Sequence, residues 1–290
     1  QKHIKDGGDV IDPRFKIKLR DYWGNEEDCD ATPRSSDGQL LFLMEMVSKM
    51  NPEGSRVGFI SNYSPFFTGE PIKDFKKSKS CESNIRKGLL EEDLVELIVQ
   101  IPDKMFFNTA IPTFLWILNN NKDPERKNKV QLIDASELFE FEKQNLGEKG
   151  KKISEENRNR ILKIYREFKN NENSKIYENN FFGYNKIQLY KYKLDKNNKK
   201  ILNKKGSPEI DRSNKIKEKV PLNVSVKDYL KTEVDPFYGD YYYDNEKLIG
   251  YQIDFIKYFY KFPKKESLGQ LKKEIKDLNK EISKGLDLDV

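Results

Sequence analysis

Residues 101–118 read Ile101-Pro102-Asp103-Lys104-Met105-Phe106-Phe107-Asn108-Thr109-Ala110-Ile111-Pro112-Thr113-Phe114-Leu115-Trp116-Ile117-Leu118. This stretch joins two apolar runs, residues 94–101 and 111–118, through a polar turn that carries two adjacent phenylalanines. Each run is too short for a helix and is bounded by proline, so both are predicted to be neighbouring strands buried on both faces. Open α/β sheets bind ligands where strands end, which makes the turn a candidate site.

The phenylalanine pair in this turn has two interpretations. Exposed aromatic rings are unfavourable unless something flat stacks on them. Alternatively, one or both rings fill the core, which is the usual place for phenylalanine. The residues by themselves leave both interpretations open.

The residues around the turn predict an α/β fold. The order strand, helix, strand, strand, strand is that of the second half of a doubly wound sheet with an antiparallel edge. Residues 1–34 are expected to be irregular. The elements expected after them are a helix over 40–50 capped by Ser36 with Gln39, a buried strand over 56–62, a loop over 64–71, a short helix capped by Ser80 or Ser83, and a strand over 130–133.

Together with residues 101–118, six further blocks of sequence resemble the modification subunits of type I restriction-modification systems. These subunits are adenine-specific DNA methyltransferases. The blocks follow the order of that family along nearly the whole chain, and they are residues 36–43, 54–69, 85–90, 129–136, 182–184 and 249–253. The resemblance implies a Rossmann-like methyltransferase sheet, followed by an α/β C-terminal extension and a terminal helix.

The resemblance also implies roles for the turn. In this family S-adenosylmethionine donates a methyl group to the exocyclic amine of an adenine that is flipped out of the duplex. An aromatic ring from the turn stacks on that base; Phe106 matches the position best, with Phe107 as the alternate. Asn108 and Thr109 either form hydrogen bonds near the base or satisfy the backbone of the turn itself.

Two motifs of the family are absent from the sequence, the glycine-rich cofactor strand and the Asn-Pro-Pro-aromatic tetrapeptide. The run Asn51-Pro52-Glu53-Gly54 lacks the second proline and the aromatic residue, and reads as a turn. We therefore expect the chain to be the C-terminal portion of the subunit, inactive and without a cofactor by itself, although the parent enzyme uses S-adenosylmethionine. Ser64, Pro65 and Phe66 are expected in a loop at the rim of the active site.

Composition excludes several classes of protein. The 290 residues are 36% apolar and 35% charged, and no apolar run approaches the ~18 residues that span a bilayer. Cys29 and Cys81 lie far apart in the sequence, which argues against a zinc site and a disulfide scaffold. His3 is the sole histidine, so no histidine-centred triad is expected. A cytoplasmic location without a membrane is predicted.

Positive charge is concentrated in residues 191–220. This segment holds eleven Lys and Arg residues against four acidic ones, a net charge of +7, whereas the whole chain carries +6. Lysines in such a segment provide sequence-independent contacts to DNA phosphates. Because lysine is abundant throughout the chain, a solvated surface is an equal alternative. The candidates for contact with the DNA backbone are Lys199, Lys200, Lys204 and Lys205.

The C-terminal part is predicted to contain mixed elements. The predicted segments are a catalytic part over 1–190, a basic loop or hairpin over 191–220, an extension over 221–262, and an amphipathic helix over 263–290. Within them we expect a helix capped by Ser154, a strand over 182–192, a helix capped by Ser225, and a half-buried strand that presents Tyr251, Ile253 and Phe255.

The last helix carries aliphatic residues at spacings of three and four, Leu268, Leu271, Ile275, Leu278 and Ile282. This seam is typical either of packing on the helix's own domain or of binding a partner. The resemblance favours a partner, because modification subunits associate with a specificity subunit, a restriction subunit and double-stranded DNA. Leu271, Ile275, Leu278 and Ile282 are the expected docking residues. The rival hypotheses are a non-catalytic module that binds a specificity subunit, and a fragment of a solitary adenine methyltransferase.

Overall fold

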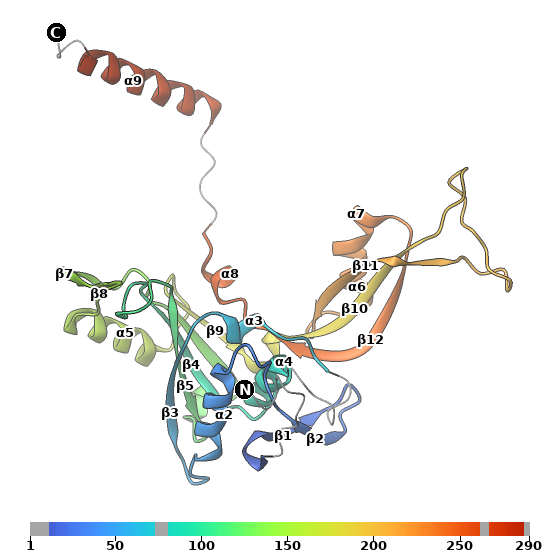
Figure 1. Cartoon of the computed structure of the whole chain (residues 1–290), viewed down its shortest axis with the longest axis horizontal. Coiled ribbons are helices and arrows are strands. Elements are labelled where there is room, and N and C mark those ends of the chain that lie inside the picture. Colours follow the sequence, from blue (N-terminus) through green and yellow to red (C-terminus); the bar gives the residue numbers. More distant parts are fainter. Residues whose placement is uncertain (1–11, 73–80, 262–266, 287–290) are drawn as a thin grey trace. The chain divides into compact units, whose positions relative to one another are not determined.

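The computed structural model describes residues 12–72, 81–261 and 267–286, and the chain divides into two compact units, residues 1–258 and 259–290 (Figure 1). The first unit contains a five-stranded sheet, a three-stranded sheet and two small hairpins, together with their helices. The second unit contains one long helix.

The five-stranded sheet has the order β3-β5-β4-β6-β9. Its strands are β3 (Arg56–Ser61), β4 (Val95–Ile101), β5 (Thr113–Asn119), β6 (Lys129–Asp134) and β9 (Ser174–Glu178). β4 and β6 are parallel, β5 runs antiparallel between β3 and β4, and β9 runs antiparallel beside β6. The predicted α/β sheet with an antiparallel edge is confirmed. β5 is a further antiparallel strand, inside the sheet.

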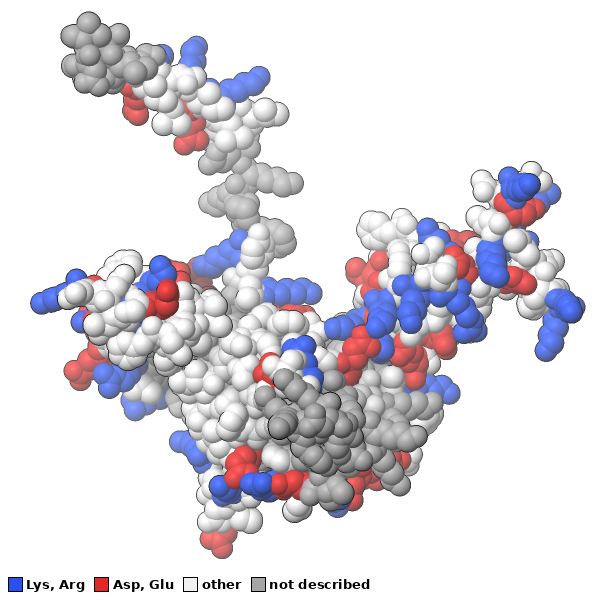
Figure 2. All heavy atoms as spheres, in the orientation of Figure 1, with Lys and Arg blue, Asp and Glu red and all other residues white. Residues whose placement is uncertain are grey.

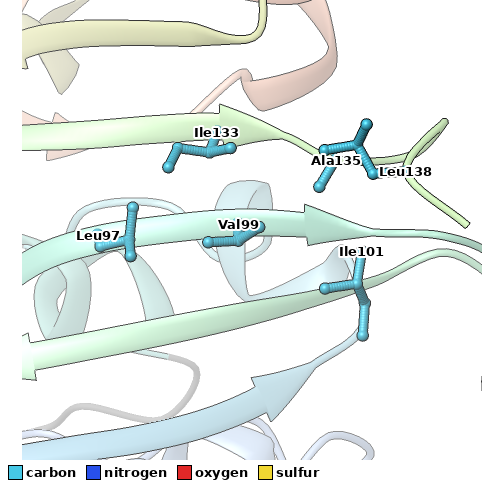
Figure 3. Close-up of a cluster of buried hydrophobic side chains, with 6 residues drawn as sticks. All are labelled: Leu97, Val99, Ile101, Ile133, Ala135 and Leu138. Carbon is cyan, nitrogen blue, oxygen red and sulfur yellow. The ribbon is translucent and has the colours of Figure 1, made fainter. Parts of the chain in front are cut away.

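One face of this sheet packs under helix α5 (Glu155–Glu167). The cluster that forms there consists of Leu97, Val99 and Ile101 from β4 and of Ile133, Ala135 and Leu138 from β6 and the segment after it (Figure 3). Three side chains of α5, Ile161, Ile164 and Tyr165, close the cluster from above. Ser154 caps the helix as predicted, since its Oγ accepts a hydrogen bond of 3.3 Å from the backbone nitrogen of Asn157.

The opposite face of the sheet carries a group of stacked aromatic rings. The rings of Phe66 and Trp116 are stacked with centroids 4.6 Å apart, and Phe114 contacts both Phe66 and Phe255 edge-on. The indole nitrogen of Trp116 donates a hydrogen bond of 2.9 Å to Ser61 Oγ, so its polar group is satisfied in the interior.

Of the helices α2 (Gln39–Ser48), α3 (Ser64–Phe67) and α4 (Glu82–Glu91), the first and the last were predicted, but α3 occupies residues 64–67, where a loop over 64–71 was expected. Pro65 fits the first turn of α3, because the first turn of a helix leaves backbone N–H groups without an internal partner. Two predicted caps are wrong: α2 follows Gly38, with Asp37 accepting the Gln39 backbone proton at 3.2 Å, and Ser83 lies inside α4. Ser80 lies outside the described residues. The prediction of a buried strand over 56–62 is also corrected, because β3 is a half-exposed edge strand.

The three-stranded antiparallel sheet has the order β11-β10-β12. Its strands are β10 (Gly183–Tyr192), β11 (Ile210–Pro221) and β12 (Tyr241–Tyr251), and one face is covered by α6 (Val226–Tyr229), the π-helical turn η5 (Leu230–Val234) and α7 (Asp235–Tyr238). Ser225 caps α6 as predicted, accepting from Asp228 N at 3.1 Å.

Two predictions for this part differ from the structure. The boundaries expected at 190/191 and 220/221 fall inside the sheet, because the first lies within β10 and the second separates Pro221 from the rest of β11. The expected strand with Tyr251, Ile253 and Phe255 is wrong, because β12 ends at Tyr251. All three side chains are buried as expected. The segment after Tyr251 is not a strand, however, and the backbone nitrogen of Ile253 donates to Phe66 O at 3.0 Å.

Two hairpins were not expected from the sequence. They are formed by β1 (Lys16–Arg20) with β2 (Glu26–Asp30), and by β7 (Glu140–Leu146) with β8 (Lys149–Lys152). The region before residue 34 was predicted to be irregular, and that is wrong for the first hairpin. Short 3-10 turns complete the unit: η1 (Pro13–Phe15), η3 (Pro124–Arg126) and η4 (Asn179–Phe182).

Helix α8 (Phe255–Phe259) closes the first unit, and α9 (Leu268–Leu286) forms the second. The predicted amphipathic helix is thus confirmed as a helix of 19 residues. Among the described residues, no helix combines the length and the apolar character needed to cross a membrane.

Candidate functional site

The carboxyl ends of β3 and β4 lie at the same edge of the five-stranded sheet, on either side of the start of β5. The register shows this, since Ser61 pairs with Phe114 and Ile101 pairs with Thr113. We call this the carboxyl edge. From it the chain continues into α3 after β3, and into the turn formed by residues 102–112 after β4. Such edges are where open α/β sheets bind their ligands.

The two phenylalanines of the turn occupy different environments. Phe106 is half-buried and packs against the cluster under α5, whereas the ring of Phe107 is 63% exposed. An isolated antiparallel bridge between Phe106 and Thr109 closes the turn. Both interpretations of the pair are thus partly realised: one ring contributes to the core and the other is presented to solvent.

The polar residues of the turn also differ from each other. Asn108 is exposed, and Thr109 is half-buried. The hydroxyl of Thr109 accepts a hydrogen bond of 3.4 Å from the backbone nitrogen of Ile111. Thr109 therefore satisfies the backbone of the turn, while Asn108 is available to a ligand.

A polar network lies at the end of β3. Gln39 and Asn62 are joined by two hydrogen bonds. Gln39 Nε2 donates to Asn62 Oδ1 at 3.0 Å, and the backbone nitrogen of Asn62 donates to Gln39 Oε1 at 2.9 Å. Ser64 donates its hydroxyl proton to Asp37. Burial acts to raise the pKa of Asp37, but hydrogen bonds from Ser64 and Gln39 outweigh it and hold that pKa below its usual value.

Sequence reasoning did not assign a site role to Asp37, Gln39 or Asn62. The first two lie in the block 36–43, which was singled out only as a helix start. Their convergence with Asn62 depends on how α2 packs beside β3, which no local pattern encodes. The charged carboxylate and the two amides are the polar groups that the carboxyl edge offers beside the aromatic turn.

The expected rim residues are divided between the surface and the interior. Ser64 is half-buried and belongs to the polar network, whereas Pro65 and Phe66 are buried. The ring of Phe66 is part of the aromatic group on the sheet, so it does not line a surface. The role at the rim stays a prediction for Ser64 alone.

A separate polar pocket of about 320 Å³ lies at the amino ends of β4 and β6, on the opposite edge of the sheet. It is lined by Lys18 and Arg20 but also by Glu26, Glu91 and Glu178. Side chains of both signs favour neither an anion nor a cation. Among the described residues no group of His, Cys, Asp and Glu side chains is arranged to hold a metal ion.

The four predicted lysines lie between β10 and β11. Residues 193–209 form two small bridged loops there, closed by pairs Leu194–Lys200 and Leu202–Pro208. Lys199, Lys204 and Lys205 are exposed, whereas Lys200 forms an ion pair with Asp240 and lies over the ring of Tyr192. Figure 2 shows Lys and Arg side chains gathered along the three-stranded sheet and at the tips of its loops.

The predicted docking residues occupy one side of α9. Leu271, Ile275, Leu278 and Ile282 follow at spacings of four, three and four, with exposed Lys and Glu side chains around them. All four aliphatic side chains are exposed. The partner that would cover them stays a prediction.

Comparison with known proteins connects this architecture to one family. The family model described as N-6 DNA Methylase matches residues 10–201. The methylase subunit of the type I restriction enzyme MjaVIII of Methanocaldococcus jannaschii is 43% identical over 88 residues, which cover 30% of this chain and 15% of that protein. The HindI methylase subunit of Haemophilus influenzae is 31% identical over 145 residues, covering 47% of this chain and 29% of the relative.

Solved structures give a weaker likeness. The methyltransferase subunit of a type I restriction-modification system from Streptococcus thermophilus matches with a TM-score of 0.41 and 23% identity, over 50% of this chain and 27% of that one. The chain spans less than a third of the length of each of these proteins.

Proposed function

Because this chain belongs to the N-6 DNA methylase family, we propose that it is the C-terminal portion of the modification subunit of a type I restriction-modification system. The complete subunit would transfer a methyl group from S-adenosylmethionine to the exocyclic amine of adenine in DNA. This portion would supply the wall that contacts the target base. The observation that carries the proposal is the exposed ring of Phe107 beside the half-buried Phe106 at the carboxyl edge.

The aromatic turn fits a flipped base for a physical reason. A base taken out of the duplex loses its stacking partners, and an aromatic side chain that replaces them contributes ~1–3 kcal/mol. Phe107 exposes most of its side chain without first unpacking from the core, whereas Phe106 would anchor the turn. Lys149, whose Nζ lies 5.4 Å from the centre of the Phe107 ring, adds positive charge where a phosphate would approach.

The proposal assigns no methyl-donor site to the described residues. The described strands β3, β4 and β6 end in Ser61-Asn62, Ile101-Pro102 and Asp134-Ala135, and none of these ends is a glycine-rich loop of the kind that holds such a cofactor. The proposal therefore concerns the base side of the reaction. The polar network of Asp37, Gln39, Asn62 and Ser64 would face the same space and orient polar groups of the nucleotide.

Double-stranded DNA and the other subunits are the proposed partners. Lys199, Lys204 and Lys205 would contact phosphates without reading sequence, and the exposed Lys215 and Lys219 of β11 would add positive charge beside them. The aliphatic row of α9 would dock on a specificity subunit, and a restriction subunit is the remaining proposed partner. That row also supports the alternative function, a non-catalytic module that only binds a specificity subunit.

The proposal is tested in the complete modification subunit assembled with its specificity subunit. Phe106→Ala and Phe107→Ala should each lower the methylation rate by about 5- to 100-fold, in line with loss of one stacked ring. The affinity for S-adenosylmethionine should stay within twofold, and Phe107→Trp should restore the rate. Phe237→Ala, which removes an even more exposed ring from α7, is the control.

The two functions give opposite results. A full rate for the variant that lacks both Phe106 and Phe107 would refute the target-base role. Subunit assembly without any methylation by the unaltered complex would instead establish the non-catalytic module.

A further inference from the structure

The hairpin of β7 and β8 contributes little to the hydrophobic core. Almost every residue of β7 is exposed, and Phe141 on it is 74% exposed. The pairing of the two strands is irregular between Phe141 and Leu146. Burial of apolar surface therefore cannot account for the stability of this hairpin, because a two-stranded hairpin by itself is only marginally stable.

The hairpin does make a dense set of contacts with the turn at the carboxyl edge. The backbone nitrogen of Glu148 donates to Phe107 O at 3.0 Å, and those of Gly150 and Lys151 donate to Lys104 O at 3.0 and 3.2 Å. Three hairpin amides thus converge on two carbonyl oxygens of the turn. A turn that projects from a sheet would otherwise expose these carbonyls to water.

Side chains strengthen the same contact. Lys151 Nζ lies 2.6 Å from Asp103 Oδ1 and 3.7 Å from the centre of the Phe139 ring. Lys104 adopts a left-handed backbone conformation, with φ of +54°, which a residue with a side chain keeps only when its surroundings enforce it. The hairpin holds Lys104 in this conformation, because two backbone amides of the hairpin donate to the carbonyl oxygen of Lys104.

Gly147 lies where the loop of the hairpin passes close to the backbone of the turn. Its φ is +62°, and a Cβ atom at this position would lie 2.5 Å from Phe107 O. No real Cβ tolerates that distance, and the opposing atom is backbone, so it cannot rotate away. A side chain at Gly147 would therefore displace either the hairpin loop or the Phe107 peptide.

We propose that the β7–β8 hairpin is a brace that positions the target-base turn, and that Gly147 is the positioning residue that lets the brace reach the backbone of Phe107. The inference rests on the proposed function, because it assigns the turn a base to contact. Gly147 itself touches no substrate and acts only through the turn.

The test compares Gly147→Ala with Gly24→Ala in the complete subunit. Both glycines lie in hairpin loops with positive φ, but Gly24 has open space around the position of a Cβ atom, so it controls for backbone strain. Gly147→Ala should lower the methylation kcat by about 10- to 100-fold, the size expected from misplacing a contact group by about 1 Å. KM for S-adenosylmethionine should be unchanged, and Gly24→Ala should retain the full rate.

Hydrogen exchange reports on the brace without any reaction. Gly147→Ala should remove protection from the amides of Glu148, Gly150 and Lys151, and Gly24→Ala should leave them protected. The decisive measurement is Gly147→Ala in the variant that already lacks both Phe106 and Phe107. If the brace acts through the rings, the rate there falls no further.

Three results would overturn the inference. One is equal rates for the two glycine variants, and another is intact protection of the three amides in Gly147→Ala. The third is a further fall in the methylation rate when Gly147→Ala is added to the variant that lacks both Phe106 and Phe107, since that would indicate a general structural defect. The variant that lacks both Phe106 and Phe107 is measured first, before Gly147 is altered. A normal methylation rate for that variant would overturn the proposed function as well.

Discussion

Arg86 donates a hydrogen bond of 2.7 Å from its Nε to the backbone oxygen of Tyr251. The same guanidinium donates from Nη1 to Pro65 O at 2.8 Å. Arg86 lies in α4, Pro65 in α3 and Tyr251 at the end of β12, so one buried side chain joins the helices beside the five-stranded sheet to the three-stranded sheet. Burial lowers the pKa of Arg86 to about 10, which still leaves it charged at pH 7.

Replacing this donor should destabilise the first unit strongly. Arg86→Met keeps the apolar stem but leaves the carbonyls of Pro65 and Tyr251 without their charged partner. Such a change should cost about 3 kcal/mol in the free energy of unfolding, as measured by urea denaturation. Arg160→Met on the exposed side of α5 should change stability by less than about 0.5 kcal/mol. Similar losses for both variants would contradict the joining role of Arg86.

The strands that sequence reasoning identified are those with continuous apolar runs. β4, β5 and β6 are covered on both faces, so nearly every residue carries the signal. The hairpin of β1 and β2 was missed because Lys, Arg, Glu and Asp occupy most of its positions, and only Ile17, Leu19 and Cys29 form its apolar cluster. Its pairing depends on partners across the hairpin rather than on local propensity.

The candidate site was predictable only in part. The turn with Phe106 and Phe107 was located because two strands flank it, and membership of the methyltransferase family is confirmed by the family model. The different burial of the two rings follows from the way α5 covers one face of the sheet, which is a tertiary effect. The contact of Gly147 with Phe107 joins residues forty positions apart, and only the folded chain reveals it.

Glu70 gives a prediction about pH. It forms hydrogen bonds with Lys186 at 2.7 Å and Lys217 at 2.6 Å, and these lower the pKa of its carboxyl to about 2. A folded pKa below the unfolded value of 4.5 means that the stabilisation is fully present above pH 4.5 and is lost as the pH falls toward 2. The carboxylate is half-exposed, so solvent screening limits the contribution to about 1 kcal/mol.

Glu70→Gln should therefore lower the free energy of unfolding by about 1 kcal/mol at pH 7, and this difference from the unaltered chain should shrink between pH 4.5 and pH 3. Glu53→Gln, at an exposed position in the turn before β3, is the control and should change the free energy of unfolding at pH 7 by less than about 0.5 kcal/mol. A difference that stays constant over this range would show that Glu70 acts through packing rather than charge.

The lysines of the basic loops give a prediction about salt. If Lys204 and Lys205 contact phosphates, Lys204→Ala with Lys205→Ala should reduce the slope of log affinity against log salt by about 2, because each contact releases close to one counterion. The measurement is fluorescence anisotropy of labelled duplex DNA with the complete methyltransferase. Lys227→Ala with Lys231→Ala removes the same charge from the helical cover of the sheet. Equal slopes of log affinity against log salt for the two double variants would show that only net charge matters, and not the position of Lys204 and Lys205.

The aliphatic row of α9 gives the last prediction. Burying each such side chain at an interface contributes ~1.5–3 kcal/mol, so Ile275→Asp with Leu278→Asp should abolish co-purification with the specificity subunit. Lys273→Gln with Lys280→Gln lowers the net charge by the same amount on the opposite side of the helix, and should leave assembly intact. Because α9 belongs to the second unit, the melting temperature of the modification subunit alone should hardly change with either pair. A large drop for the aspartate variant, with assembly preserved, would show that the row packs within its own chain and not on a partner.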